Sequence, residues 1–177
     1  MTVSGLMVRA ATLGDLNALA RLHAAVVKDQ SQWQPDETPN PQFDRQRYLR
    51  RRLGTASMIM LVAERSGEVL GYVDGQGGGA QPASRSWRRL IRRVLGRPAE
   101  PPMFLPRSDA YLANVYVAVD ARGAGVGAEL VQAFMAEARR RGCARVHTDV
   151  LAGNDASLRM FEHAGLRVRV RRLAGDL

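Results

Sequence analysis

The sequence predicts a single domain, residues 1–177, of mixed α/β class. Short apolar runs that suit β-strands alternate along the chain with stretches whose apolar residues recur at helical spacing. A glycine-rich turn joins one of these runs to an amphipathic helix. The chain is long enough to bury a full core, and 46% hydrophobic with 24% charged residues excludes the disordered, collagen-like and disulfide-rich classes. The predicted order is β-α-α-β-β-insertion-β-α-β-α-β.

The first half of the chain predicts one strand, two helices and a β-hairpin. Thr12 and Asp15 have the spacing of a capping box, and apolar residues follow them at helical intervals. Three prolines then mark a loop, and Gly54 stands where a second, basic helix should stop. The expected elements are a strand at 6–10, a helix after residue 12, a loop at 30–41, a helix at 42–53 and hairpin strands at 58–63 and 69–73.

An insertion is predicted within the domain at residues 75–108, where glycine-rich and proline-rich stretches flank one helical pattern. Residues 84–97 place apolar side chains on one helical face and arginines on the other, which predicts a basic amphipathic helix. From Arg85 to Arg107, seven arginines and one glutamate contribute +6 of the net charge of +9. We expect the apolar face to pack on the domain or on a second subunit. An anionic membrane surface and RNA are the alternatives.

The second half of the chain predicts three strands and two helices in alternation. Leu130, Val131, Phe134 and Ala138 recur at helical spacing, and Gly165 stands where the last helix should stop. The expected elements are strands at 111–119, 146–150 and 166–170 and helices at 126–141 and 155–163.

The glycine-rich turn at residues 120–127 is the segment most suited to bind a ligand. Glycines before a helix let the backbone approach a ligand and direct free N–H groups at one point, which suits a pyrophosphate. Gly123, Gly125 and Ala128 fit the dinucleotide fingerprint, with Asp149 in the place of its ribose-binding acid. A dinucleotide-binding fold needs several further parallel strands, however, and only 50 residues follow this turn.

Two motifs of the second half resemble those of the GNAT superfamily of acetyl-CoA-dependent N-acetyltransferases. Arg122, Gly125 and Gly127 match the element R/Q-x-x-G-x-G/A, and residues 154–166 are similar to the element N-x-x-A/S-x-x-x-Y-x-x-x-G-F. Residues 8–15 also look like the family's first strand and helix start. The resemblance covers nearly the whole chain apart from the insertion. It implies a GNAT-like central sheet, mixed but mostly antiparallel and flanked by helices, with the insertion before the central CoA-binding strand.

The resemblance also implies which residues would bind acetyl-CoA as cosubstrate. The amides of the turn would hold the pyrophosphate, with Arg122 at the mouth of the turn. Val117 and Val119 would offer backbone groups to the pantetheine arm, and Asn154 would bind that arm with its side chain. The expected acetyl-CoA-binding residues are Val117, Val119, Arg122, Gly123, Ala124, Gly125, Val126, Gly127, Ala128, Asn154, Ser157 and Phe161.

The chemistry that the resemblance implies is the attack of an amine on a thioester, which needs a base, a donor to the oxyanion and an acid for the thiolate. The family's tyrosine acid falls on Phe161, which has no proton to give. Tyr116 and Asn114, two residues apart on one strand face, are the catalytic residues we expect instead. We expect His163, at the end of a helix, to complement the helix dipole.

Several acidic residues stand near these positions in the sequence. Glu64, Asp74 and Asp149 end predicted strands and are candidates for the base, but we expect each to be a solvated turn residue. The loop after the first helix places Asp29, Asp36 and Glu37 near Trp33, and acids beside an aromatic ring there suit a cationic amine.

The function expected from these residues is the transfer of an acetyl group from acetyl-CoA to a primary amine of a small molecule or protein, by direct attack in a ternary complex. Two alternatives stay open. Phe161 suggests a CoA-binding regulatory protein without turnover, and the basic helix suggests an RNA- or ribosome-associated module. Nucleic acid is the less expected partner, and a homodimer is compatible with the apolar helix face.

The composition also bears on metals and compartment. Cys143 is the only cysteine, so the chain can form neither an intramolecular disulfide nor a cysteine-based zinc site, and no metal is expected. The sequence has no apolar run of about 18 residues and no N-terminal basic segment followed by an apolar core. We therefore expect no membrane-spanning helix, no signal peptide and a location in the reducing cytoplasm.

Overall fold

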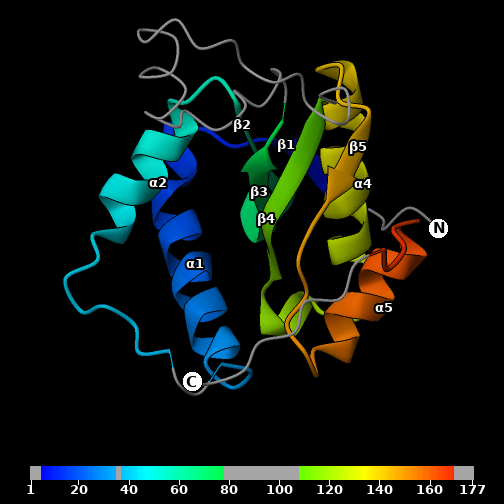
Figure 1. Ribbon diagram of the computed structural model, residues 1–177. Helices are drawn as coiled ribbons and strands as arrows, with labels where there is room; N and C mark the ends of the chain where they lie inside the picture. The colour runs from blue at the N-terminus through cyan, green and yellow to red at the C-terminus, as the bar shows by residue number, and fades with distance from the viewer. Residues whose placement is uncertain (1–4, 35–36, 78–107, 170–177) are drawn as a thin grey trace, which may run out of the picture.

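The computed structural model describes residues 5–34, 37–77 and 108–169, which form a five-stranded sheet with helices on both faces (Figure 1). The strand order is β1-β2-β3-β4-β5, with antiparallel pairs up to β4 and a parallel pair of β4 with β5. This mixed, mostly antiparallel sheet confirms the predicted fold class. The elements are β1 Met7–Ala10, η1 Leu13–Asp15, α1 Leu16–Gln30, α2 Arg45–Leu53, β2 Met58–Arg65, β3 Glu68–Gln76, β4 Asp109–Val117, η2 Val119–Ala121, α4 Val126–Arg140, β5 Arg145–His147 and α5 Asp155–His163.

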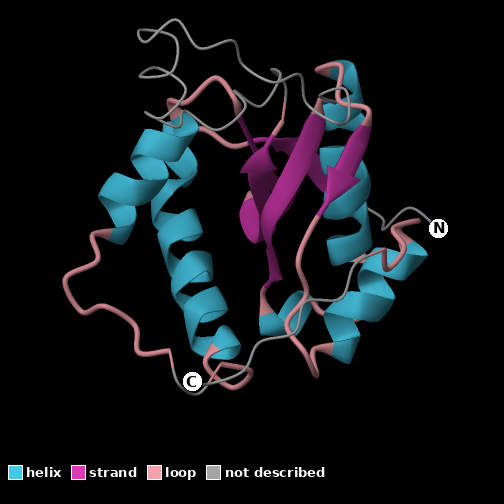
Figure 2. Cartoon of the chain, viewed as in Figure 1, coloured by secondary structure: helices cyan, strands magenta, loops and turns pink. Residues whose placement is uncertain are grey.

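Two cores lie on opposite faces of the sheet, so the central strands are buried on both sides. Figure 2 shows α1 and α2 on one face and α4 and α5 on the other. Successive residues of β3 contribute to different cores: Tyr72 packs with α1 and α2, whereas Val73 packs with α4. β3 is buried along its length except at its two end residues. None of the helices in the described ranges combines the length and apolar character needed to cross a membrane.

Most predicted elements occur with small shifts of their ends. α5 has the predicted bounds, α4 ends one residue early, and both hairpin strands are longer than predicted. The strand predicted at 146–150 occurs instead as a three-residue strand at Arg145–His147, because it pairs with β4 at residues 109–111 alone. The predicted strand at 166–170 is wrong over 166–169, which form no strand. Leu166 instead packs against the core on the α4 side.

Gly75 belongs to β3, although the sequence analysis assigned it to the insertion. The register shifts after the pair Asp74↔Asn114, and one residue of β4, Ala113, has no partner in β3. A Cβ on Gly75 would lie 2.7 Å from Cζ of Phe134, so this close approach of β3 requires glycine. Gln76 also belongs to β3, and residues 77 and 108 are described outside any strand. Residues 78–107 of the predicted insertion, with the basic helix at 84–97, lie outside the described residues.

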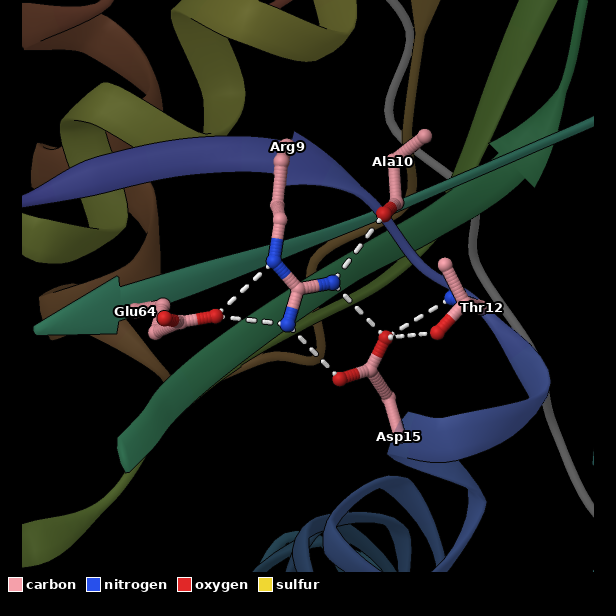
Figure 3. A network of polar contacts seen from close by, with 5 residues as sticks. All are labelled: Arg9, Ala10, Thr12, Asp15 and Glu64. Carbon is pink, nitrogen blue, oxygen red and sulfur yellow. Dashed lines mark hydrogen bonds and ion pairs between the residues drawn. The ribbon is translucent and has the colours of Figure 1, made fainter. Parts of the chain in front are cut away.

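Arg9 of β1 joins three elements at the start of the fold (Figure 3). Its Nη1 and Nη2 each donate to Asp15 at 2.8 Å, and its Nε donates to Glu64 of β2 at 2.8 Å. The backbone N–H of Thr12 donates to Asp15 at 2.7 Å, as the capping-box spacing predicted. Hydrogen bonds from Arg9 lower the pKa of Asp15 to about 2. Glu64 is therefore held in an ion pair and is not the solvated turn residue that we expected.

Candidate active site

The glycine-rich turn presents a row of unused backbone donors at the start of α4. Gly123 and Gly125 have φ angles of 78° and 81°, a conformation that glycine adopts without strain. Gly125 is the N-cap of α4 and no side chain caps the helix. Among the described residues, none accepts a hydrogen bond from the backbone N–H groups of residues 123–128. Because these donors lie at the positive end of the helix dipole, the turn is suited to bind an anion.

Gly127 allows α5 to pack close to this turn. A Cβ at Gly127 would lie 2.6 Å from Sδ of Met160, so a side chain here would displace that residue of α5. The first turn of α5 is capped by Asn154, whose Oδ1 accepts a hydrogen bond from the N–H of Ser157 at 3.1 Å. The oxygen of Asn154 thus serves the helix. The predicted contacts of Asn154 and Ser157 with a pantetheine arm stay predictions.

An opening in the sheet runs from this turn along β4. β5 pairs with β4 only over residues 109–111, so the rest of β4 has no neighbour on that side among the described strands. The N–H of Ala118 donates to Leu70 O of β3 at 2.8 Å. Because backbone groups alternate along a strand, those of Val115 and Val117 are directed away from β3 and into the opening.

Arg122 is directed toward α1. Its Nη2 donates to Asp29 of α1 at 2.8 Å, its Nε donates to Val117 O at 3.1 Å, and its guanidinium carbon lies 5.1 Å from the ring centre of Tyr116. Val119 lies in η2 and not in the predicted strand, and its carbonyl accepts the N–H of Arg122 at 3.3 Å. The side chain of Arg122 therefore ties β4 to α1. One of the acids that we expected to accept a cationic amine, Asp29, is already paired with this arginine.

The two expected catalytic residues lie on one face of β4, as predicted, but in different surroundings. The structure shows that this face is turned to α1. Tyr116 is 9% exposed and packs in the core with α1 and α2. Burial is the main cause that raises the pKa of its phenol, and the nearby Asp29 raises that pKa further. Asn114 donates from Nδ2 to Asp74 Oδ1 at 2.8 Å. Asn114 is thus part of a buried polar group that includes Asp74.

Asp74 is the centre of that buried group, which corrects our expectation of a solvated turn residue. The residue is 1% exposed because it lies in the central strand and not in a turn. Its Oδ2 accepts hydrogen bonds from Nε of Arg52 at 2.7 Å and from Nη2 of the same residue. Arg52 in turn lies over the ring of Tyr48, 5.2 Å from its centre. Since both carboxylate oxygens are engaged, Asp74 is poorly suited to act as a base.

The position of the usual tyrosine acid is filled by a core residue. Phe161 is 5% exposed and packs in the core between α4 and α5. His163, two residues later, is exposed at the end of α5, where its Nδ1 lies 2.7 Å from Arg159 O. The C-terminal position of His163 agrees with the predicted role beside the helix dipole. Neither residue brings an acid to the opening beside β4.

One polar group at the opening was missed in the sequence analysis. The rings of Tyr111 and His147 are 5.3 Å apart, and the hydroxyl of Tyr111 donates to Asp149 Oδ2 at 3.3 Å. Asp149 was a candidate, and the signal for His147 was its position two residues earlier, on the same face of an extended chain. The described residues hold no cluster of histidine, cysteine or acidic side chains that suits a metal ion.

Comparisons with known proteins agree on the kind of fold. The model of the acetyltransferase (GNAT) family matches residues 23–166. No curated protein matches the sequence. Among solved structures, a tetramutant of the BH1408 protein from Bacillus halodurans has 18% identity and a TM-score of 0.76, with 97% of this chain and 99% of that chain covered.

Two further similar structures carry the name of an activity or a ligand. AAC(6')-Iy in complex with the bisubstrate analogue CoA-S-monomethyl-acetylneamine has 16% identity and a TM-score of 0.68, with 98% of this chain and 99% of that chain covered. An aminoglycoside acetyltransferase from an uncultured soil metagenomic sample, in complex with trehalose, has 16% identity and a TM-score of 0.64, with 98% and 97% covered. At these identities the likeness concerns the fold.

Proposed function

The chain belongs to the GNAT family of acetyltransferases, and from this premise we propose that it transfers an acetyl group from acetyl-CoA to a primary amine of a small molecule or a protein. The observation that carries this proposal is the row of unused N–H donors at residues 123–128, which lies beside the opening along β4. A pyrophosphate with a long amide-bearing arm has the chemistry that both features accept.

The residues of the turn and of β4 fit acetyl-CoA in different ways. The amides of residues 123–128 would hold the pyrophosphate, and the backbone groups of Val115 and Val117 would bind the two amides of the pantetheine arm. Arg122 already donates to Val117 O. That carbonyl would therefore accept hydrogen bonds from both Arg122 and a pantetheine amide through its two lone pairs, or the pantetheine amide would replace Arg122. Arg122 is thus proposed to reach the cosubstrate only after leaving Asp29.

The reaction itself is the direct attack of an amine on the thioester within a ternary complex. The phenol of Tyr116 lies on the α1 side of β4, close to the turn. The role expected of Tyr116 is to donate a hydrogen bond to the developing oxyanion or a proton to the thiolate, and this role requires the thioester to lie at the turn end of β4. Asn114 is assigned a supporting role, since its amide holds the Asp74 carboxylate at 2.8 Å. Phe161 supports one alternative, a CoA-binding protein without turnover, because it places a core residue where an acid is usual.

Acetyl-CoA binding is tested by a pair of glycine variants at the two ends of α4. Gly123 and Gly142 have φ angles of 78° and 80°, and a Cβ at either would meet no atom within 4 Å. Both alanine variants therefore carry the same backbone strain, of about 1–2 kcal/mol. We expect Gly123→Ala to weaken acetyl-CoA binding at least tenfold in calorimetry and Gly142→Ala to leave it unchanged. Equal effects of the two variants would count against the turn as the binding site.

Turnover is tested by thioester consumption with a panel of small primary amines and peptide N-termini. We expect consumption with at least one class of amine, and thermal stabilisation by acetyl-CoA but not by NAD. Binding of acetyl-CoA without any consumption would favour the regulatory alternative. An RNA-associated role rests on residues 84–97, outside the described residues, and would appear as RNA binding that weakens steeply with salt. The single cysteine, Cys143, supports a reducing compartment such as the cytoplasm.

A further inference from the structure

The proposed function needs a base, and most carboxylates near the sheet are already engaged. Asp15 and Glu64 share the guanidinium of Arg9. Asp74 is buried against Arg52, and Asp29 is paired with Arg122. These carboxylates already accept hydrogen bonds from a guanidinium, so their oxygens are not free to take a proton from an amine. The base must therefore be sought at another place along the opening.

The narrow end of the opening is defined by the last pair of residues that joins β4 to β5. Tyr111 and His147 form this pair, and their rings lie 5.3 Å apart. The neighbours of Tyr111 in β4, Ala110 and Leu112, both pack in the core on the α4 side. Because side chains alternate along a strand, Tyr111 and His147 lie on the opposite face, the face on which Tyr116 is directed to α1.

The length of β4 suits acetyl-CoA, whose pyrophosphate would bind at the turn while its thioester lies further along the strand. From Val117, next to the turn amides, to Tyr111 the strand extends for six residues, or about 20 Å at the usual rise of a strand. A pyrophosphate bound by the turn would therefore direct the far end of its arm, which carries the thioester, toward the narrow end of the opening. His147 is exposed there and is open to an incoming amine.

We propose that His147 is the general base of the acetyl transfer, an inference that rests on the proposed function. The amine lone pair attacks the thioester carbonyl carbon, and an N–H proton passes to the imidazole, directly or through one water. The carbon–sulfur bond then breaks, and the departing thiolate takes the proton from the imidazolium. In this arrangement Tyr116 does not supply that proton, because it lies at the turn end of β4, five residues from Tyr111. Atoms and charges balance without a further reactant, because the products are an amide and the free thiol of CoA.

The charged groups around His147 favour this role. Asp149 accepts a hydrogen bond from Tyr111 at 3.3 Å, so a carboxylate lies beside the ring that contacts the imidazole. On the other side, Arg145 of β5 is paired with Asp109 of β4 at 3.0 Å, which offsets its positive charge. Tyr111 is a positioning residue here, because it holds both the imidazole ring and the carboxylate.

The three histidines of the chain allow a direct test of where the thioester end lies. His23 is buried, His163 is exposed at the end of α5, and His147 is the proposed base. In NMR spectra assigned with His→Gln variants, we expect CoA to shift the imidazole signals of His147 and leave those of His163. Adenosine 3′,5′-diphosphate, which lacks the pantetheine arm, should leave His147 unchanged. Binding of CoA without a shift at His147 would overturn the proposal.

Kinetics separate the failure of this proposal from the failure of the proposed function. We expect His147→Gln to lower kcat/KM at least 100-fold, to abolish the imidazole step in the pH profile and to keep acetyl-CoA affinity. The matched variant His163→Gln should stay within twofold of the wild type. Turnover that survives in His147→Gln contradicts the base assignment alone. Absence of acetyl-CoA binding, or of turnover with every amine in the wild type, contradicts the proposed function and this inference with it.

Discussion

At the scale of single residues, the environment of a carboxylate decides its role more than its place in the sequence. Asp74 and Asp149 both follow apolar residues of predicted strands, and the sequence predicts that both are solvated acids. Asp74 is 1% exposed and paired with Arg52, whereas Asp149 is exposed and bonded to a tyrosine. The arginine that distinguishes them comes from α2, about twenty residues away in the chain. Such a partner cannot be found from local pattern, because only the tertiary fold brings it close.

The ion pair of Asp74 with Arg52 should be important for stability. We expect Asp74→Asn to lower the free energy of unfolding by about 3 kcal/mol, because the substitution leaves a largely buried guanidinium without its counter-charge. The matched variant Asp109→Asn removes a more exposed pair, with Arg145, and should cost at most about 1 kcal/mol. Urea denaturation with unchanged m-values checks both. Equal losses in the two variants would show that burial of the pair is not the deciding factor.

At the scale of elements, short polar networks fix how neighbouring elements meet. Arg9 holds the start of η1 against β1 and β2 (Figure 3). Arg122 holds the end of β4 against α1. In both cases one guanidinium bonds to two elements that are distant in sequence. The helix-start signal at Thr12 was readable from local spacing, since both partners of the capping box lie within one turn. The long-range contacts were not readable.

The junction held by Arg9 should make stability depend on pH in the acid range. The pKa of Asp15 is lowered from 3.8 to about 2 in the folded protein, so its contribution is complete above about pH 4 and is lost as the pH falls through 2. Because Arg9 is 32% exposed and water screens the pair, we expect about 1 kcal/mol.

The measurement for Asp15 is the difference in unfolding free energy between the wild type and Asp15→Asn from pH 5 to pH 2. This difference should shrink as the pH falls. Glu137 of α4 also has a pKa of about 2, owing to Arg140 and Arg141. The control is therefore to measure the effect of Asp15→Asn in the background of Glu137→Gln, where the difference in unfolding free energy should depend on pH in the same way. A difference that stays constant with pH would contradict the role of Arg9.

At the scale of the whole molecule, the order of elements was predictable and the last strands were not. The hairpin, α4 and α5 follow from periodicity and glycine stops, which are local signals. The run at 146–150 has strand composition over five residues, yet only Val146 and His147 of this run pair with β4, because the length of a strand depends on its neighbour. The turn amides were predictable from the glycines. The pairing of Arg122 with Asp29 and the group around His147 needed the fold.

The predicted insertion connects β3 to β4, which are neighbours in the sheet, so we expect the fold to form without it. Gln76 pairs with Tyr111, and the N–H of Gly77 donates to Ser57 O at 2.9 Å. Replacement of residues 78–107 by a short glycine–serine turn would convert β3 and β4 into a hairpin. We expect cooperative thermal unfolding and retained acetyl-CoA binding in calorimetry. Loss of cooperative unfolding would show that the replaced residues belong to the core of the domain.

The short pairing of β5 also makes β4 an edge strand in the middle of a sheet. Free strand edges are usually a liability, because they recruit extended chains from other molecules. Here the backbone groups of Val115 and Val117 that face away from β3 present such an edge, and the side chains of both residues pack against the core on the α4 side. A ligand that pairs with this edge must present amide donors and acceptors to it, as a peptide does when it adds a strand to a sheet. The pantetheine arm and a peptide both carry amide groups that can pair with this edge, so this protein should discriminate between them at the anion-binding turn more than along the strand.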